Sequence, residues 1–192
     1  DDGIAVLGLD NVVGNTFEWA ERRYITLQKY EALKRYTVQP GDVLVSIMGT
    51  CGRCAVVPGD VGTAINTKHI CAITLNPALA LPEFVRAAFL WHPRSRQHLL
   101  QRTKGSIMDG LNMGIVKDMP LPLPPLDEQR RLVDQLRRAE EQRVTAVQSA
   151  HGLDALFASL QSRAFRGELS RDPADLAAAT RQDPVTMSDK WL

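Results

Sequence analysis

The C-terminal part of the chain carries an apolar seam that limits what the protein can fold into. Between residues 132 and 164, apolar residues recur at alternating steps of four and three, and only Arg143 interrupts them. That spacing is the coiled-coil period, and at 1.5 Å per residue it predicts a helix of roughly 50 Å. The seam consists of Leu132, Leu136, Ala139, Ala146, Ala150, Leu153, Phe157, Leu160 and Ala164.

A helix of this length cannot bury the seam against itself, so we expect it to pair with a second helix. The three alanines near the middle of the seam would let that second helix approach closely. A helix packed on its own domain is the alternative, although the predicted length exceeds what a small domain can cover.

A proline-rich strap leads into this helix. Residues 118–126 read DMPLPLPPL, with four prolines in near alternation. Proline restricts the residue before it and has no N–H to donate, so the strap cannot be a central strand and is predicted to run extended. Asp127 and Glu128 follow the strap, and their charges suit the N-terminal end of a helix dipole.

The first 125 residues predict a mixed α and β domain. Short apolar runs separated by glycine, proline and asparagine have the length and branched content of strands. Two helical segments interrupt the strands: one is capped by Thr26, and the other begins near Pro82 and should break or kink at Pro93. The expected strands are residues 4–9, 42–48, 54–58 and 69–75.

The predicted fold class is therefore α+β, with a mixed α/β domain followed by a long coiled-coil-type helix. We expect the domain at residues 1–124 and the strap with its helix at 125–169. Residues 170–192 are polar, contain two prolines and show no sustained period. They are predicted to form a flexible tail.

Composition places the chain among ordinary water-soluble proteins. Its 192 residues can bury one good core, and no apolar run approaches the roughly 20 residues of a membrane span. The first ten residues lack the features of a signal peptide, and the three cysteines are an odd number, which argues against a disulfide framework. We expect a cytoplasmic location.

The net charge of +1 hides a basic stretch between Phe84 and Met108 that contains no acidic residue. A stretch of one sign is what phosphate binding requires, because each neutralised phosphate releases counterions. A solvated helix face remains the alternative. The basic residues and histidines of the stretch are Arg86, His92, Arg94, Arg96, His98, Arg102 and Lys104.

A CGRC sequence raises the question of a metal or redox site. Cys51 and Cys54, with His69 and Cys71 downstream, offer the four ligand types of a zinc site, and the first pair alone resembles a redox motif. However, Cys54 and Cys71 lie in strand-like runs, which favours small buried thiols. We predict no metal site and find no phosphate loop, base-methylating motif, nucleophile elbow or zinc-protease pair.

Polar side chains in two loops suit the recognition of a nucleic acid. Asparagine pairs naturally with adenine and arginine or lysine with guanine, while serine and backbone amides suit phosphate. Asn66 and Asn112 could instead satisfy the local backbone as turn residues. As a hypothesis, phosphates are held by Arg94, Arg96, Arg102 and Lys104, and bases or sugars are contacted by Asn66, Lys68, His69, Ser106 and Asn112.

Three segments together resemble the specificity subunit of type I restriction-modification systems. They read YEALKRYTVQPGDVLVSIMGTCGRCAVVP, GSIMDGLNMGIVKDMPLPLPPLDEQRRLV and LQSRAFRGEL, and the resemblance covers nearly all of residues 4–169. Its most specific part is the Pro-Leu-Pro-Pro-Leu-x-Glu-Gln pattern at residues 122–129.

The resemblance implies a DNA target recognition domain at residues 1–124 that reads one half-site of double-stranded DNA. The long helix would be a spacer that packs antiparallel to the helix of a second unit and sets the distance between half-sites. The subunit would have no catalytic activity and bind no cofactor. It would dock a DNA adenine methyltransferase (modification) subunit and a restriction and translocation subunit, to which S-adenosylmethionine, ATP and Mg²⁺ belong.

The chain departs from the family pattern in carrying one recognition domain where members usually carry two. We therefore expect either the C-terminal half of a longer subunit or a half-length subunit that acts as a homodimer. A different class of protein, a non-catalytic adaptor whose helix oligomerises and whose α/β domain binds protein, is the alternative function; weak retention on a DNA column would distinguish it.

Overall fold

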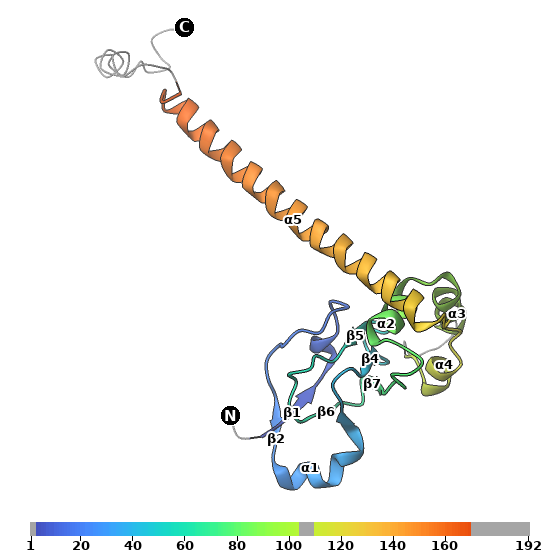
Figure 1. Ribbon diagram of the computed structural model, residues 1–192. Helices are drawn as coiled ribbons and strands as arrows, with labels where there is room; N and C mark the ends of the chain where they lie inside the picture. The colour runs from blue at the N-terminus through green and yellow to red at the C-terminus, as the bar shows by residue number, and fades with distance from the viewer. Residues whose placement is uncertain (1–2, 104–109, 170–192) are drawn as a thin grey trace. The chain divides into compact units, whose positions relative to one another are not determined.

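The first part of the chain consists of short strands and short helices, and the second part is one long helix (Figure 1). The structure is a computed structural model that describes residues 3–103 and 110–169. The chain divides into two compact units, Asp1–Leu136 and Arg137–Leu192. The predicted α+β class, with a mixed domain followed by a long helix, is confirmed. The expected tail, residues 170–192, lies outside the described residues.

The described residues of the first unit form two small β-sheets. One has the strand order β2-β1-β6-β3, in which β1 and β6 are parallel and the other neighbours antiparallel. The other is fully antiparallel, with the order β5-β4-β7. The strands are β1 (Ile4–Leu7), β2 (Tyr24–Ile25), β3 (Thr37–Val38), β4 (Val43–Ser46), β5 (Cys54–Val56), β6 (Ala64–Asn66) and β7 (Ile70–Ile73).

All four expected strands are present, as β1, β4, β5 and β7, and each is shorter than the apolar run that predicted it. Three strands were missed: β2 and β3, with two residues each, and β6, with three. Strands this short contain too few alternating residues to show a period of two. Two 3-10 helices, η1 (Leu9–Asn11) and η2 (Lys34–Tyr36), and the helix α4 (Met113–Lys117) were also not predicted.

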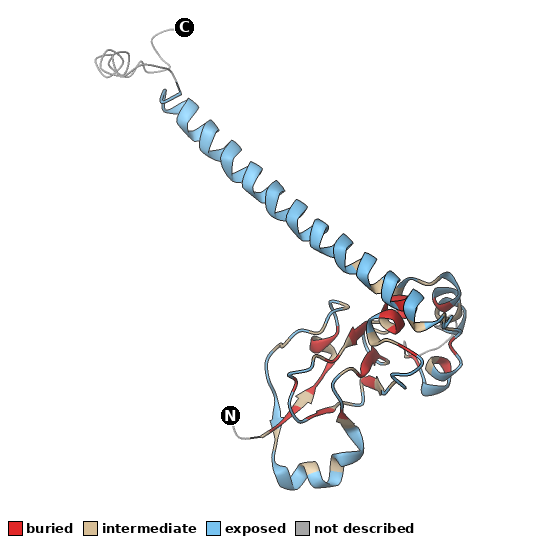
Figure 2. Cartoon of the chain, viewed as in Figure 1, coloured by how far each residue is buried: buried red, intermediate tan, exposed pale blue. Residues whose placement is uncertain are grey.

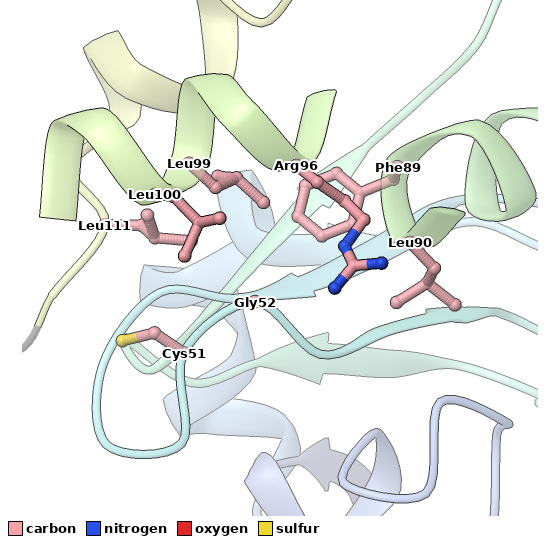
Figure 3. Close-up of a pocket in the computed structure, with 8 residues that line it drawn as sticks. All are labelled: Cys51, Gly52, Phe89, Leu90, Arg96, Leu99, Leu100 and Leu111. Carbon is pink, nitrogen blue, oxygen red and sulfur yellow. The ribbon is translucent and has the colours of Figure 1, made fainter. Parts of the chain in front are cut away.

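The expected helices form where their capping and breaking residues predict. Helix α1 (Leu27–Leu33) begins after Thr26, whose hydroxyl accepts from Lys29 N at 3.3 Å. Helix α2 (Pro82–Trp91) ends before Pro93, where α3 (Pro93–Thr103) starts as a separate helix. A small pocket lies between α3 and the turn that joins β4 to β5 (Figure 3).

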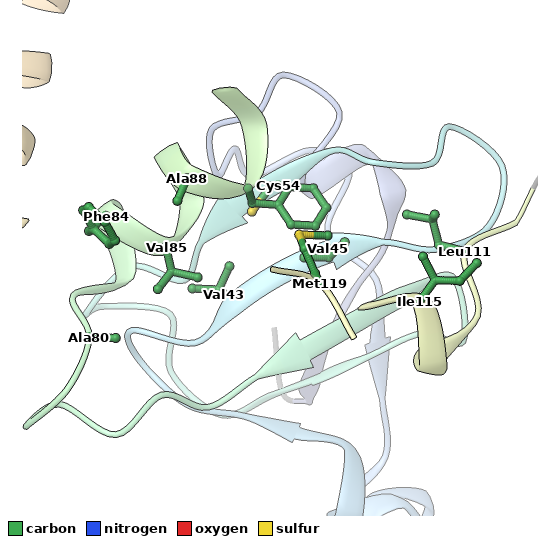
Figure 4. Close-up of a cluster of buried hydrophobic side chains, with 11 residues drawn as sticks. Val43, Val45, Cys54, Ala80, Phe84, Val85, Ala88, Leu111, Ile115 and Met119 are labelled. Carbon is green, nitrogen blue, oxygen red and sulfur yellow. The ribbon is translucent and has the colours of Figure 1, made fainter. Parts of the chain in front are cut away.

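Strand β4 is buried on both faces and separates two apolar clusters. Its residues alternate, so that Val43 and Val45 face one cluster while Leu44 faces the other. The first cluster joins β4 and β5 to α2 and α4 through Phe84, Val85 and Ile115, among others (Figure 4). The second cluster is built mainly from the strands and the loops beside them. The three-stranded sheet therefore holds the helices and the other strands together.

Helix α5 (Leu126–Phe165) begins one residue before Asp127 and directly after the proline strap. In the first unit, its Gln129 is fully buried and bonds to the segment before α2. From Arg137 to Phe165 every residue of α5 is exposed (Figure 2). Gly167, with φ +74°, closes the helix: Gly167 N donates to Ala164 O and Glu168 N to Arg163 O. Among the described residues, no helix is long and apolar enough to cross a membrane.

Candidate nucleic-acid interface

A groove of about 860 Å³ lies beside the turn between β6 and β7, and we call it the basic groove. Apolar side chains such as Ile47 and Ile65 line part of it. Its polar and charged lining residues are Lys29, Arg35, Tyr36, Thr37, Asp42, Asn66, Thr67, Lys68, His69 and Thr74.

The exposed charges of the basic groove are all positive. Lys29, Arg35 and Lys68 are exposed, whereas Asp42, the acidic lining residue, is only 2% exposed. The Asp42 carboxylate accepts a hydrogen bond from Gln39 N at 2.8 Å, so it is engaged inside the fold and does not add a negative charge to the exposed surface of the groove. A concave surface lined by one sign of charge concentrates the opposite charge, which here is anionic.

Arg35 and Tyr36 add a stacking surface to the basic groove. The Arg35 guanidinium carbon lies 4.7 Å from the centroid of the Tyr36 ring, and both side chains are exposed. Planar aromatic and guanidinium groups are the surfaces on which nucleic-acid bases stack. Lys29, Arg35 and Tyr36 were not predicted from the sequence. Their exposure is visible only in the structure, where α1, which carries Lys29, buries none of its residues and leaves even Leu27 69% exposed.

Three of the predicted base or sugar contacts line the basic groove together: Asn66, Lys68 and His69. Asn66 is half-buried and its side-chain amide donates to Thr67 O at 3.1 Å and Ile70 O at 2.7 Å. These bonds leave the Asn66 carbonyl oxygen for a ligand. Lys68 is exposed and therefore has its ammonium group available.

A second predicted loop approaches the groove at one end. Ile47 N donates to His69 O at 2.9 Å, and Leu111 N donates to Ile47 O at 2.8 Å, so the segments around residues 69 and 111 meet across Ile47. Met113 lines the groove, but Asn112 does not. The Asn112 side chain caps α4, accepting from Ile115 N at 2.9 Å. Lys104 and Ser106 lie outside the described residues.

The predicted phosphate contacts on α3 lie apart from the lining of the basic groove. Arg94, Arg96 and Arg102 are all exposed. At 100° per residue, Arg94 and Arg102 share a side of the helix and Arg96 points the opposite way. Arg96 lines the apolar pocket with Cys51 and Gly52, and Figure 3 shows its guanidinium beside Leu90.

Two other members of the basic stretch are engaged within the fold. Arg86 donates to Asn15 O at 2.6 Å, and a ring nitrogen of His98 lies 2.9 Å from Ile115 O. Ser95, also on α3, is fully buried and donates to Pro120 O at 3.2 Å. The Ser95 and His98 contacts hold α3 against the strap and α4, so Arg94 and Arg102 lie on a helix that is fixed in place.

Cys51 and Cys54 occupy the hairpin of β4 and β5, not the start of a helix, and Cys71 lies in β7. Cys51 is half-buried in the turn between β4 and β5, and Cys54 begins β5. Burial raises the pKa of the Cys54 thiol to about 12, and it also raises the pKa of Cys71. Thiols held in this neutral form are poor metal ligands and nucleophiles. In the part of the chain that the structure describes, no three histidine, cysteine or carboxylate side chains form a metal-binding group.

Residues 11–147 match a family described as the type I restriction modification DNA specificity domain. The chain belongs to this family. The resemblance seen in the sequence is thereby confirmed. Among curated relatives of the type I specificity domain, the type I restriction enzyme EcoBI specificity subunit of Escherichia coli is 28% identical over 173 residues, which cover 88% of this chain and 36% of that subunit. The chain therefore spans about a third of that relative's length.

Two solved structures are similar to this chain in their fold. The HsdS subunit from Thermoanaerobacter tengcongensis has a TM-score of 0.65 at 22% identity, covering 88% of this chain and 44% of that one. A chain from a structure concerned with complex assembly and conformational transition of the type I R-M system has a TM-score of 0.63 at 18% identity, covering 88% of this chain and 40% of that one. The type I specificity domain thus adopts the fold of these subunits.

Proposed function

We propose that this type I specificity domain reads one half of a two-part DNA sequence through the basic groove. The observation that carries the proposal is the groove itself, where three exposed cations and a stacked Arg35–Tyr36 pair surround the turn that holds Asn66, Lys68 and His69. Cations attract the DNA backbone regardless of sequence, and the polar side chains at the turn supply hydrogen bonds to base edges.

Arg94 and Arg102 of α3 serve as phosphate contacts outside the groove, whereas Arg96, also predicted as a phosphate contact, faces the pocket beside Cys51 and is not included. Arg94 and Arg102 project from one side of a helix that is anchored to α4 and the strap, a placement suited to fixing the register of the domain on the duplex. Lys104, Ser106 and Asn112 remain predicted contacts from the neighbouring loop. Asn112 would have to contact DNA while it caps α4, or act only as that cap.

For the rest of the assembly, the proposal rests on membership of the type I specificity family. Helix α5 pairs with the helix of a second recognition unit, supplied by a second copy or by a longer chain, and sets the distance between the two half-sites. The chain itself performs no catalysis and binds no cofactor. Modification and restriction subunits dock on it in the cytoplasm and supply S-adenosylmethionine, ATP and Mg²⁺.

The proposal is tested by co-expressing the chain with its modification subunit in a methylation-free host and mapping methylated adenines. The unaltered chain should produce one two-part motif. Arg35→Ala and Lys68→Ala, which remove cations from the basic groove, should reduce methylation at that motif or relax one of its positions. Arg131→Ala removes an exposed cation of α5 outside the groove and serves as the matched control.

Unchanged methylation in both groove variants would contradict the role of the groove. Normal methylation in the Arg131→Ala control combined with loss in the groove variants would support it. If purified chain also fails to bind duplex DNA at low salt, the protein-binding adaptor becomes the better account.

A further inference from the structure

An apolar groove, which we call the strap groove, lies on the first unit between α2, the proline strap and the first turns of α5. Its volume is about 650 Å³, and it is open to solvent. Two large apolar side chains that line it are more than half exposed, Leu123 at 54% and Trp91 at 53%. His92 also lines the groove, and its Nδ1 is buried without a hydrogen-bond partner among the described residues. Such a surface is typical of a docking site.

We propose that the occupant of the strap groove is Phe165 of a second copy of this chain, paired along the α5 seam in an antiparallel register centred on Gln148. This inference rests on the helix pairing in the proposed function and specifies where the pairing ends. Phe165 is 91% exposed, the largest exposed fraction among the large apolar side chains described.

Side-chain size favours the centred register. The seam residues occupy the a and d positions of a heptad, and in an antiparallel pair each a position faces a d position of the other helix. Centring the pair on Gln148 gives every seam residue such a partner. Phe157 then faces Ala139, so the largest seam residue meets one of the smallest. Leu136 faces Leu160, and Ala150 faces Ala146 near the twofold axis. A shift by one heptad either way leaves two seam residues of each copy without a partner.

Arg143 favours the antiparallel orientation. In a parallel, in-register pair, Arg143 would face Arg143 of the second copy, and two like charges would meet in the seam. In the centred antiparallel register it faces Leu153 and comes beside Asp154. Arg143 already binds Glu140 at 2.7 Å, whereas Asp154 has no hydrogen bond or ion pair among the described residues. Asp154 of the second copy is thus an available partner for Arg143.

The same register brings Phe165 to the strap groove. Leu132 faces Ala164 of the second copy, so Phe165 of that copy lies level with the start of α5. Val133 and Phe165 each follow a seam residue by one position, so both lie on the same flank of the seam. A twofold axis between the antiparallel helices places this flank of both helices on the same side of the pair. Val133 packs against the core of the recognition domain, so this side of the pair is the one that faces the domain. Phe165 therefore reaches the side of the helix pair where the strap groove opens.

The contact must come from another copy. Leu132, which lines the groove, and Phe165 lie on one continuous helix, where 33 residues at 1.5 Å separate them by about 50 Å. The twofold pair would fill both grooves, one at each end, and so couple dimer formation to the position of each recognition domain.

The register is tested by cross-linking the full chain with a short bismaleimide. In the centred register, residue 147 of one copy lies beside residue 147 of the other, so Val147→Cys should give a covalent dimer. Val144→Cys is the matched control, because Val144 is equally exposed, 43% against 45%, but points away from the seam. Both variants carry Cys51→Ser, which removes the least buried native cysteine.

Groove occupancy is tested by the dimer dissociation constant from sedimentation. Phe165→Ala should weaken the dimer by about tenfold or more, the effect of removing an interface anchor. Val144→Ala, at the same heptad position but far from the groove, should leave the dissociation constant nearly unchanged. Leu123→Ala should weaken the dimer as well, and the double variant should lose less than the two single losses combined.

The outcomes separate this inference from the proposed function. Equal dissociation constants for Phe165→Ala and Val144→Ala would overturn groove occupancy, and a cross-linked Val144→Cys or a monomeric chain at high concentration would overturn the register. Neither result depends on DNA. Conversely, a normal dimer that fails to bind DNA would refute the proposed function and leave this contact intact.

Discussion

Gln129 is the last residue of the proline pattern and the first buried polar residue of α5. Its side chain has no exposed surface, and two of its three hydrogen bonds tie the start of α5 to the segment before α2 while the third reaches the strap. Gln129 Oε1 accepts from Leu81 N at 2.9 Å, and Nε2 donates to Leu79 O at 2.9 Å and Pro124 O at 2.7 Å. A carboxamide is the side chain that can donate twice and accept once at this position.

We predict that Gln129→Ala lowers the free energy of unfolding by about 3 kcal/mol, because it leaves three part-buried backbone groups without their partner. Urea denaturation followed by circular dichroism measures the change. Gln135→Ala, a substitution at an exposed glutamine of the same helix, should change stability by less than about 0.5 kcal/mol. Similar losses of unfolding free energy in the two variants would mean that the hydrogen bonds of Gln129 do not account for its effect on stability.

Cys54 should make stability depend on pH in alkaline solution. Burial raises its pKa from 9.0 to about 12, so between these values the folded chain holds the thiol proton more tightly than the unfolded chain does. The stabilisation is complete below pH 9 and is lost as the pH rises towards 12, at about 1.4 kcal/mol per pH unit.

In Cys54→Ala, the unfolding free energy should therefore fall less steeply above pH 9 than in the unaltered chain. Every other ionisable group is the same in both proteins, so the difference between the two slopes isolates Cys54. Parallel slopes would show that its thiol is not held in the neutral form.

Helix α3 is the element on which the phosphate hypothesis can be tested by itself. Arg94 and Arg102 share one side of it, and neither has a hydrogen-bond or ion-pair partner among the described residues. If they hold phosphates, Arg94→Gln and Arg102→Gln should each weaken DNA binding for all sequences. Each should also reduce the slope of log Kd against log salt by about 1.

Arg96→Gln is the internal comparison on α3, because Arg96 points to the other side and over the pocket in Figure 3. Anisotropy of a labelled duplex at several salt concentrations measures all three variants. A slope that stays constant in Arg94→Gln and Arg102→Gln would remove α3 from the DNA interface.

In the assembled molecule, α5 should act as the ruler between half-sites. Inserting seven residues after Gln148 preserves the seam and lengthens the helix by about 10 Å, which matches about three base-pair steps. We predict that the two half-site sequences persist and that the gap between them grows by at most about three base pairs. Mapping methylated adenines measures the gap.

A two-residue insertion at the same place is the control, since it rotates half of the seam by about 200°, to the opposite side of the helix, and should abolish the motif. An unchanged gap in the seven-residue variant would mean that something other than α5 sets the distance.

The sequence by itself determined the features that depend on local chemistry. The strap, the long helix with its seam, the Thr26 cap and the break at Pro93 all follow from residues close together in the chain, and the structure contains each of them. The family was also recognisable, because its proline pattern and flanking segments are contiguous stretches of sequence.

Only the tertiary structure decided which residues share a surface. It joined the turn at Asn66 to Lys29 and Arg35, which lie about 30 to 40 residues earlier, and it placed Arg94, Arg96 and Arg102 outside that groove. It also gave Gln129 its partners about 50 positions away. Strands of two or three residues and contacts across such separations leave no periodic trace, because their stabilisation comes from packing and hydrogen bonds between distant segments.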